Sequence, residues 1–517
     1  MALQKPLLYG ILHLGASSMS MTIVEYTTLD QVKIIEYASR DVTFGEELFQ
    51  NHRLSFDTIE EICRVLKGYK RLMKEYGVTE YKVYGTAIVR EADNRRSILD
   101  QIFIQTGFTV EVVDMPKEIY YKYFGLYYHM TKEGFTDTKD AALFLDITSG
   151  GVGITVWQGG AMLFQENVHI GTLRVMESFN RNQRSSLSFP DAVGEYLYSM
   201  LSPVRDEVSR FNVKYVILSG DEAKQIARLM GVESSGARGT VAMLPQQFNQ
   251  FVDSFHGVTS TKLMNRFGLP EHRANILMPT LVLYHEILKM VHAQTLLISS
   301  SGFVNGVTLY YGAEVENHPF LYMLREQNVQ LARSVAQRYH VDETHAREAE
   351  RFGLQICDAL QDHGITTRMA FLLRIAAILS EVGKYVSLRN HSEHGYHIVM
   401  GTDIFGLSDR EKEIVANVVY YQYKGTPGDD DDNFRRLREL QKICVTKLVA
   451  ILRMARALDA SHKHKIERIS LHRRDSNIVV EAVAQEDVSL EKWTFAREAD
   501  YFSEVFGLSI KLKIGGR

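Results

Sequence analysis

The stretch from Ala141 to Gly160, AALFLDITSGGVGITVWQGG, has the pattern of a β-hairpin with a glycine-rich turn. An apolar run ends at Asp146, small residues follow, and a second β-rich run reaches Trp157. Glycine lets backbone N–H groups converge where a Cβ atom would clash. The stretch therefore predicts a strand, a turn that approaches another group closely, and a second strand.

A stretch near the N-terminus has the same outline. An apolar run from Leu8 to Ala16 is followed by Ser17 and Ser18, and then by the β-rich run Met19 to Tyr26. Residues 7–40 are predicted to form a meander of strands, after which helices and strands alternate to residue 130. This order favours a mixed sheet covered by helices, and the same hairpin theme begins again at Ala141.

The pattern changes at about Asn317, where strand signals end and helical periods take over. Residues 466–517 return to strand-like patterns such as ISLHR and NIVVEAV. We therefore predict two α/β domains at residues 1–130 and 131–316, an all-α domain at 317–463, and a small α+β domain at 464–517.

The bulk composition describes a globular protein with several cores. The chain has 517 residues, of which 45% are hydrophobic and 24% charged, and its net charge of −4 gives no reason to expect a nucleic-acid partner. Cys63, Cys357 and Cys444 lack metal-like spacing, which favours buried thiols in a reducing cytosol. Charged residues interrupt the apolar segment Ile276 to Ile298, so no membrane span is expected. We expect a cytoplasmic protein.

Several short segments follow one another in a specific order. They are HLGASS (His13 to Ser18), TAIVREADN (Thr86 to Asn94), DMPKEI (Asp114 to Ile119), DITSGGVG (Asp146 to Gly153), the set Gly171, Arg174 and Glu177, and LRMARALD (Leu452 to Asp459). In this order and spacing they resemble the motifs of the bacterial Ppx/GppA family, the exopolyphosphatases and guanosine pentaphosphate phosphohydrolases. The resemblance covers nearly the whole chain.

The resemblance implies an α/β fold with two actin/Hsp70/sugar-kinase-like (ribonuclease H-like) domains around a cleft. An all-α HD-like domain and a small C-terminal α+β segment would follow, and a homodimer is implied. In the family, water attacks the terminal phosphoryl group of polyphosphate or of pppGpp (guanosine pentaphosphate). A glutamate acts as general base, and an aspartate helps to hold Mg²⁺.

Carried onto this chain, the resemblance assigns the general base to Glu118 and the metal-linked carboxylate, for Mg²⁺ or Mn²⁺, to Asp146. The two turns would bind phosphate because backbone amides and hydroxyls can surround an oxyanion. The residues that the resemblance assigns to phosphate binding are Gly15, Ser17, Ser18, Arg90, Gly150 and Gly151.

The chain also departs from the family pattern. The aspartate of the first turn is His13, and imidazole is a poor ligand for Mg²⁺. Thr148 and Ser149 replace glycines in the second turn. Acidic Asp221 and Glu222 near the expected phosphate path would repel polyanions. The metal-binding His-Asp pair of the helical domain is Ser380-Glu381, although His345 and Asp459 stand at plausible ligand positions.

Other interpretations stay open at this point. Arg90 could pair with Glu91 or Asp93 on a helix surface, and Asp146 could cap its turn. The departures also suit a catalytically degenerate protein that binds polyphosphate or a guanosine alarmone and regulates through its helical domain. A kinase or ATPase on the same fold is a weaker hypothesis, because fold alone does not set function.

Overall fold

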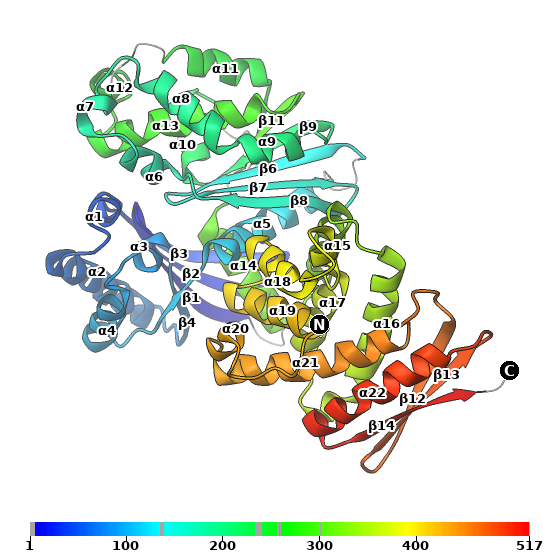
Figure 1. Cartoon of the computed structure of the whole chain (residues 1–517). Coiled ribbons are helices and arrows are strands. Elements are labelled where there is room, and N and C mark those ends of the chain that lie inside the picture. The colour runs from blue at the N-terminus through cyan, green and yellow to red at the C-terminus, as the bar shows by residue number, and fades with distance from the viewer. Residues whose placement is uncertain are drawn as a thin grey trace. The chain divides into compact units, whose positions relative to one another are not determined.

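The computed structural model describes residues 6–134, 139–232, 240–255, 258, 260–299 and 301–515 (Figure 1). The chain forms two compact units, of which the first ends at Gln327 and the second begins at Asn328. This boundary falls within helix α15 (Pro319–Arg338). The domain limits predicted from the sequence stay predictions.

The first unit begins with a mixed sheet in the order β3-β2-β1-β4-β5. The first three strands pair antiparallel, β4 lies parallel to β1, and β5 lies parallel to β4. Its strands are β1 (Leu7–Leu14), β2 (Ser18–Thr28), β3 (Gln31–Asp41), β4 (Glu80–Gly85) and β5 (Val110–Val112). The predicted meander is confirmed.

The second sheet of this unit repeats the arrangement in the order β10-β11-β9-β6-β7-β8. Again an antiparallel meander is followed by a parallel strand beside its first member, and a second parallel strand beyond it. The strands are β6 (Ala141–Ile147), β7 (Val152–Gln158), β8 (Ala161–Val168), β9 (Val213–Ser219), β11 (Thr295–Ser299) and the added antiparallel edge β10 (Thr240–Met243). The predicted repeat is therefore confirmed as two related lobes.

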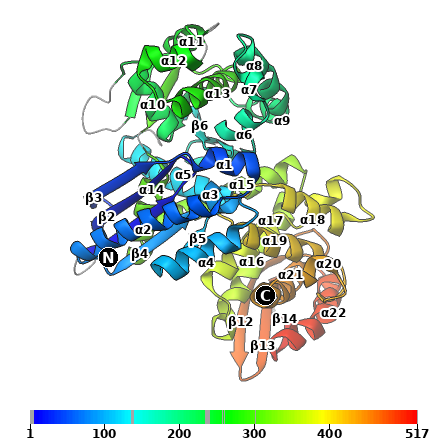
Figure 2. The same cartoon turned by 90° about the vertical axis from the view of Figure 1, so that its left-hand side faces the viewer.

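Helices α2 (Phe56–Glu75) and α4 (Arg95–Thr106) cover one face of the first sheet (Figure 2). The Ser55 side chain caps α2 by accepting a hydrogen bond from the amide of Thr58. The apolar face of α2 that packs on the core contains Ile59, Ile62, Leu66 and Tyr69. Two short helices precede them along the chain: α1 (Phe44–Asn51) comes directly before α2, and α3 (Ala87–Arg90) directly before α4.

The stretch from Arg90 to Thr106 is not one continuous helix in the structure. Helix α3 ends at Arg90 and α4 begins at Arg95. The side chain of Asn94 binds the backbone of Leu54 through both its amide nitrogen and its oxygen, at 2.9 and 3.2 Å. This tertiary contact competes with helix continuation and leaves Arg90 at a helix end.

The other face of the first sheet is covered by α14 (Phe303–Glu316), although α14 lies far along the chain. The Tyr9 hydroxyl donates to the carbonyl of Thr308 at 2.6 Å. Helix α14 in turn crosses α5 (Met115–Lys132) where Gly125 meets Gly306. A Cβ atom at Gly125 would lie 2.9 Å from the Gly306 Cα, so only glycine permits this close crossing.

Helix α5 also packs on the second sheet, where the ring of Tyr123 lies 5.8 Å from that of Phe144. The remaining helices of the second lobe lie beyond this sheet in Figure 1. They are α6 (Thr172–Glu177), α7 (Arg181–Arg184), α8 (Phe189–Met200), α9 (Ser202–Val208), α10 (Asp221–Leu229), α11 (Pro245–Asp253), α12 (Ser260–Phe267) and α13 (Glu271–Leu288). Helices α8 and α9 are separate because Pro203, in the first turn of α9, lacks the backbone N–H that would continue α8.

The second unit is all-α and then α+β, as predicted. Its elements are α16 (Glu343–Ala359), η2 (Gln361–His363), α17 (Thr367–Ile378), η3 (Val382–Tyr385), α18 (His391–Gly401), α19 (Asp409–Tyr421), α20 (Asp432–Arg435), α21 (Glu439–Ala457), β12 (Ile466–Arg474), β13 (Asn477–Ala484), α22 (Ser489–Phe506) and β14 (Ser509–Gly515). One continuous apolar core runs through the helices and the strands, from Val329 to Ile510.

The cysteines and the apolar helices were also the subject of predictions from the sequence. The three cysteines, Cys63, Cys357 and Cys444, are buried and carry free thiols, as predicted. Among the described residues, none of the helices combines the length and the apolar character that crossing a bilayer would need.

We expect Gly306→Ala to lower the free energy of unfolding by about 1–3 kcal/mol, because its Cβ atom would overlap the backbone carbonyl of Tyr121. The urea concentration at the unfolding midpoint measures the effect. Gly68→Ala in α2 is the matched control, since its Cβ atom would meet open space and the change should be neutral or stabilising. Equal stability of the two variants would contradict the close crossing.

Candidate active site

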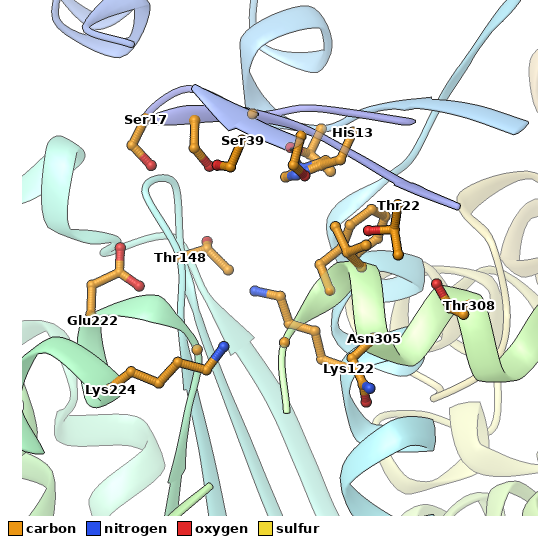
Figure 3. A pocket seen from close by; sticks show the side chains of 18 of the residues that line it. His13, Ser17, Thr22, Ser39, Lys122, Thr148, Glu222, Lys224, Asn305 and Thr308 are labelled. Carbon is orange, nitrogen blue, oxygen red and sulfur yellow. Dashed lines mark hydrogen bonds between the residues drawn. The ribbon is translucent and has the colours of Figure 1, made fainter. Parts of the chain in front are cut away.

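A cleft with a cavity volume of about 1220 Å³ lies between the two lobes of the first unit (Figure 3). The first lobe contributes the turn after β1 and part of α5. The second lobe contributes the turn after β6, the start of α10 and the turn before α14. Strand ends and helix starts therefore meet at this cleft.

The turn after β1 presents Ser17 and Ser18 to the cleft. The Gly15 amide donates to the carbonyl of Ser18 at 3.0 Å, which closes the turn. A Cβ atom at Gly15 would lie 2.8 Å from that carbonyl oxygen and 2.9 Å from Cε1 of His13. The structure thus brings Gly15, Ser17 and Ser18 together, with glycine required at the tightest point.

The turn after β6 presents Thr148 and Ser149 to the cleft, but not Gly150 or Gly151. The Thr148 hydroxyl accepts from the Gly151 amide at 3.0 Å, so the β-branched side chain closes the turn. Cβ atoms at Gly151 and Gly171 would overlap the Met115 side chain and the turn's own backbone, respectively. The glycines therefore permit close packing within the protein.

A buried lysine lies between the two predicted carboxylates. Lys122 Nζ is 2.9 Å from Asp146 Oδ2 and 3.5 Å from Glu118 Oε1. The other oxygen of each carboxylate accepts a hydrogen bond. Arg90 Nη1 donates to Glu118 Oε2 and Ser219 Oγ donates to Asp146 Oδ1, both at 2.9 Å. We refer to Arg90, Glu118, Lys122 and Asp146 as the ion chain.

Neighbouring opposite charges in the ion chain favour the ionised forms of the buried side chains. Burial opposes ionisation of Glu118, but Lys122 and Arg90 outweigh it and lower the pKa of the Glu118 carboxyl. Burial opposes the charged form of Lys122 as well, yet Asp146 and Glu118 raise the pKa of its ammonium group. Burial raises the pKa of Asp146, while Lys122 and Ser219 act in the opposite direction. Glu118 and Lys122 are therefore both charged at neutral pH.

Arg90 orients Glu118 from behind the cleft. Its guanidinium group also donates to Glu91 Oε1 at 2.9 Å and to the Val113 carbonyl at 3.0 Å. Glu91 in turn accepts from Arg174 Nη2 at 2.5 Å. Arg90 does not line the cleft, so its predicted contact with phosphate stays a prediction.

The structure separates the predicted site residues into two groups. Those that line the cleft are Gly15, Ser17, Ser18 and Glu118, and those that lie behind it are Arg90, Asp146, Gly150 and Gly151. Asp146 is 0% exposed. Lys122 was not predicted as a site residue, although it is the only charged residue in the otherwise apolar, aromatic run from Ile119 to Tyr128. A lysine among residue types that favour burial was the available signal.

The cleft wall carries both signs of charge. Glu222 lines it as expected, but Lys224 and Arg228 follow on the same helix. The side chain of Asp221, and Ser300 in the small-residue stretch before Phe303, lie outside the described residues. The expected repulsion of polyanions at Glu222 is thus offset by nearby lysine and arginine.

The sequence matches the profile of the Ppx/GppA phosphatase family over residues 22–311 and that of Ppx/GppA phosphatase domain III over residues 325–501. The chain belongs to the Ppx/GppA phosphatase family.

Similar members of the family include proteins named guanosine-5'-triphosphate,3'-diphosphate pyrophosphatase. That of Aeromonas hydrophila is 19% identical over 420 residues, covering 80% of each chain. That of Aliivibrio fischeri is 19% identical over 478 residues, covering 92% of this chain and 88% of the relative.

Solved structures of the family share the fold. The Aquifex aeolicus Ppx/GppA member has a TM-score of 0.51 and 22% identity, covering 60% of this chain and 99% of its own. An exopolyphosphatase from Cytophaga hutchinsonii has a TM-score of 0.51 and 16% identity, and the match covers 60% of this chain and 98% of that structure. The predicted fold class, two actin-like lobes followed by a helical domain, is confirmed.

The residues around Asp146 do not fit the Mg²⁺ or Mn²⁺ ion that membership of the Ppx/GppA family implies. Mg²⁺ needs oxygen ligands at about 2.0–2.1 Å in octahedral geometry. Both oxygens of Asp146 are engaged, one by Lys122 and one by Ser219. An ion bound there would meet the ammonium group of Lys122, and His13 supplies imidazole where the family has a carboxylate.

The second unit holds a separate cluster of possible metal ligands. His345, Glu381 and His462 place ligand atoms within 4.8 Å of one another. His345 Nδ1 lies 2.8 Å from Asp459 Oδ2. Despite burial, hydrogen bonds from Lys384 and Tyr423 lower the pKa of Glu381 to about 2. The sequence analysis named His345, Glu381 and Asp459 but missed His462.

We expect Lys122→Met to lower the free energy of unfolding at pH 7 by about 3–5 kcal/mol, because two buried carboxylates lose their shared cation. Burial would then raise the folded-state pKa of both above the unfolded value. A raised carboxyl pKa means that the folded state binds more protons, so the variant should gain stability as pH falls from 8 to 5.

Urea unfolding of both proteins across this pH range measures the effect. In the wild type, the lowered pKa of Glu118 contributes stability above about pH 4.3, the unfolded-state value, and this is lost only at lower pH. Lys132→Met, which removes an exposed pair with Asp30, is the control and should change stability by about 1 kcal/mol or less at every pH. A pH-independent loss in Lys122→Met would contradict the assigned charges.

Proposed function

We propose that this Ppx/GppA phosphatase hydrolyses the terminal phosphoanhydride bond of inorganic polyphosphate or of guanosine pentaphosphate and releases orthophosphate. The observation that carries the proposal is the ionised Glu118 at the wall of a cleft that two hydroxyl-bearing turns also line. The names of the relatives, a guanosine pentaphosphate pyrophosphatase and an exopolyphosphatase, support this substrate class.

In the proposed reaction, the oxygen of a water molecule forms a bond to the terminal phosphorus while its proton passes to Glu118. The bond from this phosphorus to the bridging oxygen breaks, and the bridging oxygen leaves with the electron pair on the shortened chain. The proton then leaves Glu118 for solvent or product. Phosphoryl transfer depends mainly on positioning and charge neutralisation, so a carboxylate of lowered pKa can serve although it is a weak base.

The turns and the cleft lysines would hold the phosphate chain. Hydroxyl groups of Ser17, Ser18 and Thr148 can donate to phosphate oxygens, and Lys122 and Lys224 bring positive charge to the same cleft. Backbone amides of the two turns are suited to the same task. Phosphate contacts of Arg90, Gly150 and Gly151 would require the parts behind the cleft to move.

The setting that we propose is a bacterial cytoplasm, with the chain acting as a homodimer. Both follow from the family resemblance. Size-exclusion chromatography with light scattering measures the oligomeric state, and a monomer at working concentration would remove the homodimer from the proposal.

We expect orthophosphate release from long polyphosphate or from guanosine pentaphosphate at a rate well above that from ATP. Glu118→Gln should reduce the rate about 100-fold or more, because proton acceptance in the transition state is lost. Glu111→Gln is the matched control, since Glu111 is an exposed carboxylate paired with Lys117, and its rate should stay unchanged.

No phosphate release from any of these compounds by the folded protein would refute the hydrolase. Calorimetric binding of polyphosphate or the nucleotide without turnover would point instead to the regulatory alternative. Faster turnover of ATP than of the other compounds would favour the kinase or ATPase hypothesis.

A further inference from the structure

We propose that the ammonium group of Lys122 is the fixed cation of this site, in the place of a divalent metal ion at Asp146. As far as it concerns catalysis, this inference rests on the proposed hydrolase function. It predicts that the cleft binds and cleaves its phosphoanhydride substrate without a metal ion held by Asp146.

The position of Lys122 is that of a shared counter-ion. Its Nζ atom lies within hydrogen-bond distance of Asp146 Oδ2, at 2.9 Å, and faces Glu118 Oε1 at 3.5 Å. Its side chain is 8% exposed, and that of Asp146 is 0% exposed. Two buried positive centres at one carboxylate would repel each other strongly, so the lysine and a divalent ion exclude one another.

The charges of the ion chain lead to the same conclusion. Glu118 and Asp146 carry two negative charges, and Arg90 and Lys122 carry two positive charges, so the buried chain is balanced. Without Lys122 the chain would carry a net charge of −1, because Arg90 still pairs with Glu118, and a carboxylate oxygen of the kind that a divalent ion prefers would be left without a cation. With Lys122 present, an added ion would leave an uncompensated buried charge.

His13 also makes the cleft less suited to a divalent metal ion. The family pattern has an aspartate in the first turn, and this chain has lost that anion. Nε2 of His13 lies 3.0 Å from Thr86 Oγ1, and its ring packs 4.8 Å from that of Phe303. The first turn therefore offers no carboxylate to a metal ion, and Lys122 places a cation beside the carboxylate of the second turn.

Lys122 can also act on the substrate. An ammonium group has three N–H donors, of which one is hydrogen-bonded to Asp146 and a second can be directed toward Glu118 at 3.5 Å. The side chain lines the cleft, and Figure 3 shows its nitrogen directed toward Thr148 at the cavity. The third donor can therefore contact a phosphate oxygen while the other two keep the group in place.

Titration with Mn²⁺ followed by electron paramagnetic resonance, which separates free from bound ion, tests the inference without turnover. The full chain carrying His462→Ala is used so that the cluster of the second unit loses a ligand. We expect no saturable Mn²⁺ site that depends on Asp146. A site of about one ion per chain that Asp146→Asn removes would overturn the proposal.

Lys122→Ala in the same background frees Oε1 of Glu118 and Oδ2 of Asp146 and leaves room for an ion. This variant should gain one Mn²⁺ site, and adding Asp146→Asn should remove it. Lys132→Ala is the matched control from the same cleft and should gain none. Equal Mn²⁺ binding by the two lysine variants would count against the inference. If Lys122→Ala does not fold, the Mn²⁺ titration of the His462→Ala protein, which retains Lys122, still tests the inference.

Phosphate release in the presence of EDTA gives the catalytic readout. We expect the rate to persist under chelation and to fall in Lys122→Met. The inference would be overturned if EDTA abolished phosphate release and if added Mn²⁺ restored it in proportion to the occupancy of a site at Asp146. If the protein releases no phosphate under any condition, the proposed function is refuted. The Mn²⁺ titration does not depend on turnover, so it still tests the role of Lys122.

Discussion

The buried ion pair between Lys122 and Asp146 is the interaction on which the cleft of the first unit depends. Asp146 lies one residue before the end of the central strand β6 of the second sheet, and Lys122 comes from α5, which packs against both that sheet and α14. Loss of either partner would leave a charge buried without compensation. The pair is possible because Gly125 and Gly306 let α5 and α14 cross closely, which fixes Glu118 and Lys122 beside the turn after β6.

This arrangement keeps the carboxylate that we propose as the general base charged, although the two turns depart from the family pattern. Glu118 stays ionised between Arg90 and Lys122, so its charge state does not depend on a bound ion. The same two cations make it a weak base. Catalysis on this site would therefore come mainly from the orientation of the phosphate chain and from fixed positive charge, the factors that dominate phosphoryl transfer.

Much of the fold could be predicted from the sequence, because the alternating strands and the repeated hairpin are local patterns. The glycine turn after Asp146 also predicted a close approach, but the structure places Gly171 and Met115 there, where a ligand was expected. Lys122 could not be assigned because its partners depend on how α5 packs in three dimensions. Likewise, the break between Arg90 and Arg95 follows from the contact of Asn94 with Leu54.

Anomalous diffraction at the manganese edge from crystals soaked in Mn²⁺ shows whether Lys122 or a metal ion neutralises Asp146. We expect electron density for the Lys122 ammonium group between Glu118 and Asp146, and no anomalous peak within coordination distance of Asp146. An anomalous peak at Asp146, with Lys122 turned away from it, would refute the role of Lys122 as the fixed cation.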